Sequence, residues 1–579
     1  MLKTLWNYLS KRRQKQFWLL LALMIIASLS EVVSVGAVLP FLAVLIAPEE
    51  IYQHSLMQPI IRILDLTEPS QLILPLTVFF IIAALLAGAI RLILLYTITR
   101  LSYAAGADLS INIYRRTLYQ KYAVHVSRNS SEVINGIITK TNTVISGIFA
   151  PVLTLISSII LLIGIIGTLF VINITIALSA SIGFGLLYWL VIRYTKTQLL
   201  NNSQIVADQS TQMIKSLQEG LGGIRDVLID GTQQFYCQLY RSADLPLRRA
   251  LGNNQFISGS PRYAMEAIGM TLIAGLAYFI TQQEGEVVTV IPTLGALALG
   301  AQRLLPALQQ AYGAYSTIKG SKSSFEDVLN LLKQPLPEYA DQRLSNPIPF
   351  EKEIKLTNLN FRYTEDSPWV LKDINLSLKK GSRIGFIGVT GSGKSTLLDI
   401  IMGLLSATGG ELSIDQQPLN SQNRRAWQAH IAHVPQNIYL SDSSIAENIA
   451  FGISKEQIDY QLVKKAAQQA QIAELIEEWK DGYQTFVGER GMRLSGGQRQ
   501  RIGIARALYK KADVLIFDEA TSALDNSTER AVMSAIEDLG RDLTILIIAH
   551  RLSTLNVCDQ IVEVSKGRVF NKKSDVKNG

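Results

Sequence analysis

The chain has 579 residues, of which 48% are hydrophobic and 18% charged, and its mean hydropathy is +0.22. This length exceeds that of one hydrophobic core and the composition suits a chain partly in lipid, so we expect at least two domains. The net charge of +8 comes from short basic clusters beside apolar segments, which argues against a nucleic-acid partner, and Cys237 and Cys558 have no paired or metal-like spacing.

The first element is an apolar segment that follows the basic sequence KRRQK near the N-terminus. Its apolar character continues for roughly 30 residues, about 45 Å as a helix, through EVVSVGAVLPFLAVLI. A signal peptide has a shorter apolar region, so we interpret this segment as a retained membrane span longer than the ~30 Å bilayer core. A short amphipathic helix on the inner membrane surface is expected before it, at LWNYLSKRR.

The remaining apolar segments predict five further spans, at 72–98, 144–171, 174–192, 263–281 and 287–306. Lysine and arginine gather in the connections after the second and fourth spans, whereas the opposite connections are acidic or neutral. By the positive-inside rule, both termini and these two long connections are cytoplasmic, in a multi-pass protein of the cell (inner) membrane. The long connections keep a helical pattern, and their tips, near 125–131 and 228–240, are either plain loops or docking segments for a soluble domain.

The outer connection after the first span contains a candidate amphipathic helix near 54–66. Met57, Ile60, Ile61 and Leu64 recur at helical spacing, and Pro59 lies near the start. We expect this helix to lie at the outer membrane interface.

The composition changes after Leu332. Residues 333–350 are rich in proline and polar residues and predict a linker, and residues 351–579 alternate apolar strands with helices. The predicted fold is a multidomain membrane protein: a six-helix all-α transmembrane domain over residues 1–332, followed by a soluble α/β P-loop NTPase domain.

The sequence GVTGSGKS, from Gly388, matches G-x-x-x-x-G-K-S between an apolar strand and an apolar helix. Glycines let backbone N–H groups surround a β-phosphate, Lys394 reaches the β- and γ-phosphates, and Ser395 ligates Mg²⁺. We therefore predict a nucleoside triphosphate site with bound Mg²⁺ at Gly388, Thr390, Gly391, Ser392, Gly393, Lys394, Ser395 and Thr396.

The sequence VLIFDEA supplies two acidic residues at the end of a buried strand. Asp518 can join the magnesium shell, and Glu519 can polarise a water in line with the γ-phosphate. A buried acid pair can also be structural, but beside a P-loop we favour the catalytic interpretation.

Between these motifs lies LSGGQ, from Leu494, whose Ser-Gly-Gly can present a hydroxyl and N–H groups to a phosphate at the start of a helix. The P-loop of the same chain already has that task. The simplest interpretation is that LSGGQ serves the nucleotide of a second copy.

The P-loop, LSGGQ, VLIFDE, SALD and an isolated histidine occur in the order seen in the ATP-binding cassette family, which this chain resembles over its whole length as a half-size exporter. The resemblance implies that the nucleotide is ATP and that its adenine stacks on Tyr363. Alternatively, Tyr363 is part of the strand core. The resemblance also implies a magnesium ligand at Gln436, communication between sites through Asp525, and a switch histidine at His550. It assigns contacts with the γ-phosphate across a dimer to Ser495, Gly497 and Gln498.

Every catalytic position of that family is intact, so one chain can supply two equivalent sites if it pairs with itself head to tail. The expected assembly is a homodimer that holds two ATP and two Mg²⁺. Closure on the γ-phosphate and release after hydrolysis would be transmitted through the inner connections.

Three arginines of the membrane half, Arg91, Arg262 and Arg303, fall on the cytoplasmic side of the bilayer centre by helical rise. A basic cavity at this depth would suit a diphosphate headgroup, because guanidinium pairs bidentately with phosphate. Alternatively, Arg91 and Arg262 extend to the membrane interface, Arg262 pairs with Glu266, and Arg303 pairs with Glu31.

The sequences SPRYAMEAIGM and QRLLPALQQAYGAYSTIK and the outer helix resemble those of bacterial lipid-linked oligosaccharide flippases. In that family, arginines matching Arg91, Arg262 and Arg303 line the cavity, so the resemblance implies transport of a polyprenyl-diphosphate glycan or related glycolipid to the outer leaflet. A multidrug, lipid or peptide exporter stays open as an alternative. The six predicted spans exclude an ABC ATPase that acts on ribosomes or DNA, and Glu519 argues against an ATP-gated channel or receptor.

Overall fold

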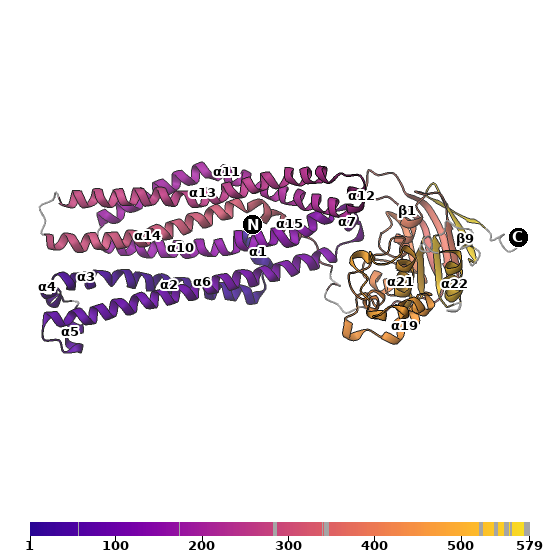
Figure 1. Cartoon of the computed structure of the whole chain (residues 1–579), viewed down its shortest axis with the longest axis horizontal. Helices are drawn as coiled ribbons and strands as arrows, with labels where there is room; N and C mark the ends of the chain where they lie inside the picture. The colour runs from indigo at the N-terminus through magenta and orange to yellow at the C-terminus, as the bar shows by residue number, and fades with distance from the viewer. Residues whose placement is uncertain are drawn as a thin grey trace. The chain divides into compact units, whose positions relative to one another are not determined.

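The computed structural model describes residues 1–55, 57–172, 174–281, 287–337, 340, 347–519, 525–537, 542–548, 555 and 558–572, and for some helical residues it describes the backbone alone. The chain divides into two compact units (Figure 1). Residues 1–120 and 128–336 form the first unit, and residues 121–127 and 337–579 form the second.

All the regular secondary structure described in the first unit is helical. Its helices include α1 (Leu2–Tyr8), α2 (Lys11–Gly36), α3 (Val38–Ile46), α4 (Pro48–Gln53), α5 (Gln58–Leu64), α6 (Ile73–Leu118), α8 (Ser130–Asn135), α9 (Thr141–Val144), α10 (Ala150–Ile172), α11 (Ile174–Gly222), α12 (Ile224–Ile229), α13 (Gln233–Thr281), α14 (Val287–Gly320) and α15 (Lys322–Leu332). Two π-helical segments, η2 (Gly136–Lys140) and η3 (Ile145–Phe149), join α8, α9 and α10 into one long run.

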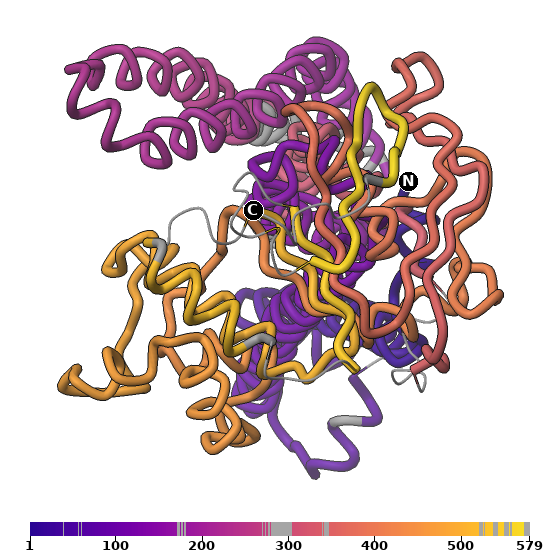
Figure 2. The backbone as a smooth tube through the Cα atoms, turned by 90° about the vertical axis from the view of Figure 1, so that its right-hand side faces the viewer, coloured from indigo at the N-terminus to yellow at the C-terminus, as the bar shows by residue number. Residues whose placement is uncertain are grey.

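Three helical segments among the described residues are long and apolar enough to cross a membrane: Lys11–Ile46, Pro69–Leu118 and Ser130–Phe170. The other predicted spans fall in α11, α13 and α14, where the structure leaves many side chains undescribed. In this unit α2 packs against α6, α10 against α14, and α11 against α13. The hairpin end shared by α11 and α13 extends away from the other helices of the unit (Figure 2).

The first span is not one continuous helix, because α2 ends at Gly36 and α3 begins at Val38. Pro40 explains the break: it has no N–H to donate to the Gly36 carbonyl, and its ring crowds that carbonyl. At the other end of α2, Ser10 caps the helix by accepting a hydrogen bond from the Arg13 N–H at 3.3 Å.

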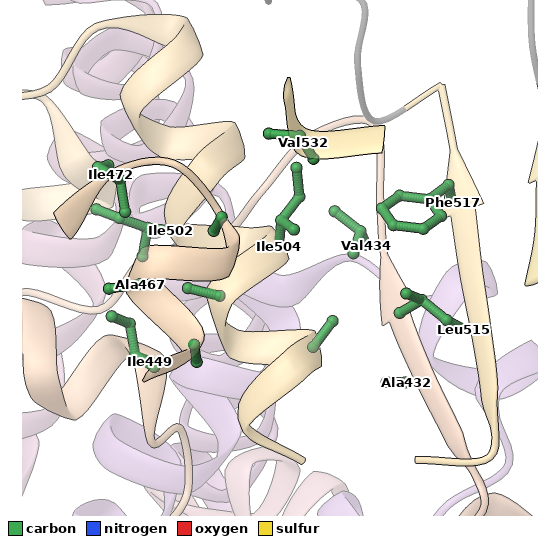
Figure 3. Close-up of a cluster of buried hydrophobic side chains, with 14 of the residues drawn as sticks. Ala432, Val434, Ile449, Ala467, Ile472, Ile502, Ile504, Leu515, Phe517 and Val532 are labelled. Atoms are coloured by element: carbon green, nitrogen blue, oxygen red, sulfur yellow. The ribbon is translucent and has the colours of Figure 1, made fainter. Parts of the chain in front are cut away.

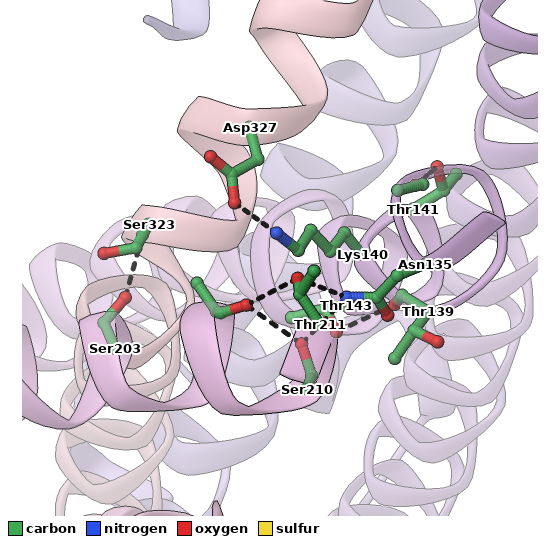
Figure 4. Close-up of polar contacts among 12 residues, drawn as sticks. Asn135, Thr139, Lys140, Thr141, Thr143, Ser203, Ser210, Thr211, Ser323 and Asp327 are labelled. Carbon is green, nitrogen blue, oxygen red and sulfur yellow. Dashed lines mark hydrogen bonds and ion pairs between the residues drawn. The ribbon is translucent and has the colours of Figure 1, made fainter. Parts of the chain in front are cut away.

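Polar side chains connect the helices at one end of this unit (Figure 4). Lys140 of η2 lies 2.5 Å from Asp327 of α15. The Asn135 amide donates to Ser210 of α11 at 3.0 Å, and Ser203 of α11 accepts from the Ser323 N–H of α15 at 2.8 Å. These contacts tie α8, η2, α11 and α15 together.

The second unit contains two sheets. A four-stranded antiparallel sheet has the order β2-β1-β4-β5, and a six-stranded sheet has the order β10-β9-β3-β8-β7-β6. In the larger sheet β9, β3, β8, β7 and β6 are parallel and only β10 is antiparallel. The strands are β1 (Glu353–Phe361), β2 (Leu371–Lys379), β3 (Arg383–Ile387), β4 (Gly409–Ile414), β5 (Gln417–Pro418), β6 (Ile431–Val434), β7 (Val514–Asp518), β8 (Thr544–Ile548), β9 (Gln560–Ser565) and β10 (Arg568–Lys572).

Apart from α7, the helices of this unit follow β1 in the sequence and connect its strands. The helices are α7 (Tyr122–Ser127), α16 (Lys394–Ile401), α17 (Arg424–Gln428), α18 (Ile445–Ile449), α19 (Tyr460–Gln469), α20 (Ala473–Glu478), α21 (Gly496–Tyr509) and α22 (Asn526–Glu537). The short helix α7 groups with this unit although its chain neighbours belong to the first.

Successive residues of β7 point to opposite faces of the larger sheet, as the period of two requires. Val514 and Ile516 join a core that contains Leu397 of α16. Leu515 and Phe517 join a second core that contains Ile502 and Ile504 of α21 (Figure 3). The helix after the P-loop and the helix after LSGGQ therefore cover opposite faces of one sheet.

Candidate functional site

The predicted nucleotide-binding motifs follow the carboxyl ends of neighbouring parallel strands. The P-loop follows β3, Gln436 follows β6, and Asp518 ends β7 with Glu519 directly after it. In open α/β sheets, ligands bind at this edge. His550 follows β8 in the sequence and lies outside the described residues.

The P-loop glycines have backbone conformations that other residues rarely adopt. Gly388 has φ +145°, and a Cβ there would lie 2.2 Å from the Val564 carbonyl oxygen. Gly393 caps α16 with φ +106°, and a Cβ there would approach Leu371 Cδ2 to 2.9 Å. Both positions require glycine, which keeps the turn compact enough for its N–H groups to surround a phosphate.

The side chain of Lys394 lies along the loop and is buried. Its Nζ donates to the carbonyl oxygens of Gly388 at 2.8 Å and Val389 at 3.1 Å. Ser392 Oγ is also buried and has no hydrogen-bond partner among the described residues. An ammonium held on backbone oxygens and an unpartnered buried hydroxyl both fit an anionic group in this turn. The exposed Thr390 and Gly391 complete the loop.

The residues for magnesium, Ser395 and Asp518, lie close enough for the Ser395 side chain to affect the pKa of Asp518. Burial and the neighbouring Glu519 raise the pKa of Asp518, while Ser395 and Lys394 oppose this shift. No group of three or more His, Cys, Asp or Glu side chains gathers in the described part of the chain. The donor set present, a hydroxyl and a carboxylate beside a phosphate cradle, suits Mg²⁺, which binds few protein ligands together with substrate phosphates.

Glu519 lies beside Gln436. The Gln436 Nε2 donates to Glu519 Oε2 at 2.7 Å, and the Glu519 N–H donates to the Ile548 carbonyl at 3.2 Å. Glu519 itself has φ +51°, an uncommon conformation that turns the chain away from β7. The two residues that the sequence assigned to water activation and to magnesium are thus in direct contact.

Tyr363 follows β1, and its side chain is 53% exposed. Its hydroxyl lies 3.2 Å from Thr396 Oγ1 of α16, and its ring packs edge-on against Phe361. The structure therefore places this aromatic ring beside the P-loop helix, on the surface rather than in the strand core.

LSGGQ forms the start of α21. Ser495 caps the helix by accepting from the Gln498 N–H at 3.2 Å, and the Gln498 side chain accepts from the Ser495 N–H at 2.7 Å. Gly497 lies in the first turn between them. The N–H groups at this helix N-terminus that the capping box does not use make it a suitable anion site.

Asp525 caps the start of α22. Its carboxylate accepts from the Ser527 hydroxyl and from the Thr528 N–H, and these hydrogen bonds hold its pKa well below the usual range. Asp525 is exposed, and the predicted communication between two nucleotide sites through this residue stays a prediction.

One acidic residue near the site was missed in the sequence. Burial and the nearby Asp518 raise the pKa of Asp399 to about 6. The signal was present, since Asp399 follows Ser395 by four residues on α16 and so shares its helix face.

Two membrane arginines border cavities in the first unit. Arg91 lines a cavity of about 380 Å³ between α6, α10 and α14, and lies 3.4 Å from the buried Glu31. Arg262 lines a cavity of about 430 Å³ between α11, α13 and α14, and lies 2.8 Å from Glu266. Gln310 lines both cavities. The side chain of Arg303 is outside the described part, although its backbone lies in α14.

Comparison with known proteins supports the domain predicted in each half of the chain. The sequence model described as ABC transporter transmembrane region matches residues 15–294, and the one described as ABC transporter matches residues 371–522. A solved bacterial Atm1-family ABC exporter with ATP bound is similar in fold, with a TM-score of 0.78 at 23% identity over 98% of this chain and 96% of that one.

Curated relatives include proteins named ATP-dependent lipid A-core flippase. The one from Alkalilimnicola ehrlichii is 35% identical over 61% of this chain, and the alignment spans 59% of its own length, less than two thirds. The one from Paraburkholderia xenovorans is 27% identical over 81% of this chain and 78% of its own length.

These matches confirm the predicted fold, a helical transmembrane domain followed by an α/β nucleotide-binding domain, and the predicted ATP binding and ATPase activity. The P-loop and VLIFDE, which lie at strand ends in the structure, are among the motifs by which the sequence resembles the ATP-binding cassette family. The chain belongs to the ABC transporter family, with the arrangement of a half-size exporter.

Proposed function

We propose that two copies of this chain hydrolyse ATP between them and thereby move a lipid-linked oligosaccharide, or a related glycolipid, from the inner to the outer leaflet of the inner membrane. The observation that supports the pairing most strongly is the position of LSGGQ. It begins a helix that packs on one face of the sheet, while the P-loop helix packs on the other. A second copy, related by a twofold axis, would bring Ser495 and Gly497 to the P-loop of the first.

The α11–α13 hairpin gives further support for a second copy. At its tip, Leu228, Ile229 and Phe235 are 61%, 72% and 59% exposed. Apolar side chains clustered on a tip that leaves the helical bundle favour contact with another protein surface.

In the proposed reaction, Lys394 and the P-loop N–H groups bind the phosphates, and Ser395 and Asp518 hold Mg²⁺, which neutralises phosphate charge when bound. Glu519 orients and polarises the attacking water. The hydrogen bond from Gln436 holds the Glu519 carboxylate in place. Because Gln436 is also a proposed magnesium ligand, it connects the magnesium site with the carboxylate that activates water. We assign His550 to the γ-phosphate on family resemblance alone.

The cargo proposal depends on the two basic cavities. Arg91 and Arg262 can each bind a phosphate bidentately, and Gln310 can donate to a cargo in either cavity because it lines both. Glu31 and Glu266 already pair with these arginines, so a phosphate would have to share or displace a carboxylate. The sequence resemblance to the flippase PglK favours a diphosphate-linked oligosaccharide, with Arg303 as a third arginine.

A glycolipid of the lipid A-core type is the second candidate cargo, because the curated relatives carry that name. Reconstitution into vesicles that contain one candidate lipid at a time would distinguish the two. We expect ATP-dependent appearance of the oligosaccharide lipid in the outer leaflet for the wild type and none for Glu519→Gln. Transport of lipid A-core alone would support the proposed ATP-driven transport but assign lipid A-core as the cargo. Transport of neither lipid would contradict the flippase proposal.

A further inference from the structure

A third cavity in the first unit lies between α2 and α6, and it is larger than the two cargo cavities. Its volume is about 670 Å³, and its lining includes Arg13, Gln16 and Leu19 from α2 and Tyr96, Arg100 and Tyr103 from α6. The buried Leu20 and Leu101 form its floor. We call it the α2–α6 groove.

The groove has a polar end and an apolar end. On α2 its lining runs from Arg13 to Leu23, ten residues or about 15 Å along the axis, which is half of the ~30 Å bilayer core. The α2–α6 groove therefore crosses the inner edge of the predicted spans, with Leu23 and Tyr96 inside them and Arg13 and Arg100 just outside. On the topology proposed above, the Arg13 end faces the cytoplasm, and Arg100 lies nearer the apolar end, since it precedes Asp108, the partner of Arg13, by eight residues or about 12 Å along α6.

The two arginines of the groove differ in their partners. Arg13 Nε lies 2.8 Å from Asp108 Oδ2, and its NH1 donates to Gln16 at 2.9 Å. The guanidinium of Arg100 lies 5.8 Å from the centre of the Tyr96 ring and forms no ion pair with any described carboxylate. The uncompensated positive charge of the groove is therefore that of Arg100.

The groove is distinct from the cavity of Arg91. Arg100 follows Arg91 by nine residues, which is about 180° around a helix of 3.6 residues per turn. The two arginines thus lie on opposite faces of α6, and no residue of the groove lines the Arg91 cavity.

We propose that the α2–α6 groove holds one anionic glycerophospholipid of the inner leaflet as a bound lipid, not as cargo. Arg100 binds its phosphate, because a guanidinium without a carboxylate partner can pair bidentately with phosphate. One acyl chain runs from Arg100 past Leu23 and Tyr96 toward the bilayer centre, and Tyr103 lies on the headgroup side of Arg100, as tyrosines do at membrane interfaces. The proposal does not depend on the cargo, since it concerns another face of α6.

Native mass spectrometry of the purified full-length protein tests the site. The protein is titrated with phosphatidylglycerol or with phosphatidylcholine of identical acyl chains. We expect the wild type to retain phosphatidylglycerol in preference, and Arg100→Gln to lower its retention at least fivefold while basal ATPase activity stays unchanged. The matched control is Arg12→Gln, an exposed arginine of α2 that does not line the groove, and it should bind like the wild type.

Equal retention by Arg100→Gln and wild type would overturn the proposal, as would an equal loss in Arg12→Gln, which would indicate unspecific attraction. Should Arg100→Gln not fold, equal retention of the two lipids by the wild type would overturn it as well. The competing occupant is a second copy. A chain with Leu19→Cys and Tyr96→Cys, in a Cys237→Ser background, should form no disulfide between protomers on oxidation in membranes. Efficient linkage between protomers would show that protein fills the groove.

Discussion

Lys140 of η2 and Asp327 of α15 form an ion pair with a distance of 2.5 Å, in which the lysine side chain is 8% exposed and the aspartate side chain 42% exposed. The two partners are therefore unequal. Loss of the aspartate leaves a buried ammonium without a counter-ion, whereas loss of the lysine leaves a carboxylate that water can reach.

This inequality predicts that Asp327→Ala destabilises the protein more than Lys140→Met. We expect about 2–3 kcal/mol for the first variant and about 1 kcal/mol for the second. Thermal unfolding of the purified protein would rank the two, and the double variant Lys140→Met with Asp327→Leu should recover part of the loss. A larger loss for Lys140→Met would show that the pair is not held as described.

Glu519→Gln should retain ATP binding and lose turnover. The substitution leaves the P-loop and its Lys394 contacts intact but removes the carboxylate that Gln436 holds at 2.7 Å. We expect the ATPase rate to fall at least about 100-fold with nucleotide affinity within a few-fold of wild type. Turnover at the wild-type rate would contradict the assignment of Glu519.

Arg91 can be tested together with its carboxylate partner. Arg91→Ala leaves Glu31, which is 6% exposed on its side chain, without this arginine, so the single variant can fail for structural reasons alone. The double variant Arg91→Ala with Glu31→Gln removes both charges. If Arg91 binds cargo, the double variant should recover stability and basal ATPase activity but not lipid flipping. Recovery of flipping would assign Arg91 to a structural ion pair.

Arg303→Ala should impair flipping more than basal ATPase activity if this arginine binds cargo. The two rates, measured in the same vesicles, separate a cargo contact from a structural one. Equal loss of both would favour an internal ion pair.

Asp415 predicts a stability effect that depends on pH. Burial disfavours its charged form, but hydrogen bonds from the N–H groups of Glu351, Glu353 and Lys352 and the charge of Lys352 outweigh this, so its pKa is lowered. A lowered pKa adds stability above the unfolded-state value of about 3.9 and loses it as pH falls through the folded-state value.

We therefore expect Asp415→Asn to destabilise the protein by about 1–2 kcal/mol at pH 7, with a smaller difference from wild type near pH 3. Asparagine is the matched substitution because Asp415 has φ +46°, which asparagine tolerates. Chemical denaturation of the full chain at the two pH values measures the difference. A difference that grows toward low pH would contradict the account.

Local patterns were sufficient to predict most of the nucleotide-binding half. Each of its motifs combines an apolar strand with glycines or acids directly after it, and parallel strands bring such ends to one edge of a sheet. The contact between Gln436 and Glu519 was not predictable, because it depends on how β6 and β7 pair in register. In the membrane half, Pro40 in the sequence carried the signal for the break after α2. The structure places Arg91 beside Glu31, a contact that the sequence did not suggest, since the rotation of one helix against another is set by packing that no local pattern records. The predicted pairing of Arg303 with Glu31 stays a prediction, because the Arg303 side chain lies outside the described part of the chain.

The central claim is that the P-loop of one copy meets LSGGQ of the other, and cysteine cross-linking tests it most directly. Val389→Cys and Gln498→Cys are introduced together with Cys237→Ser and Glu519→Gln, because Val389 is exposed on the P-loop and Cys237 is the exposed native cysteine. Oxidation with ATP and Mg²⁺ should give a product of twice the 64.0 kDa chain mass, and neither single-cysteine variant should give it. A cross-link formed only within one chain, or one that is independent of ATP, would contradict the account.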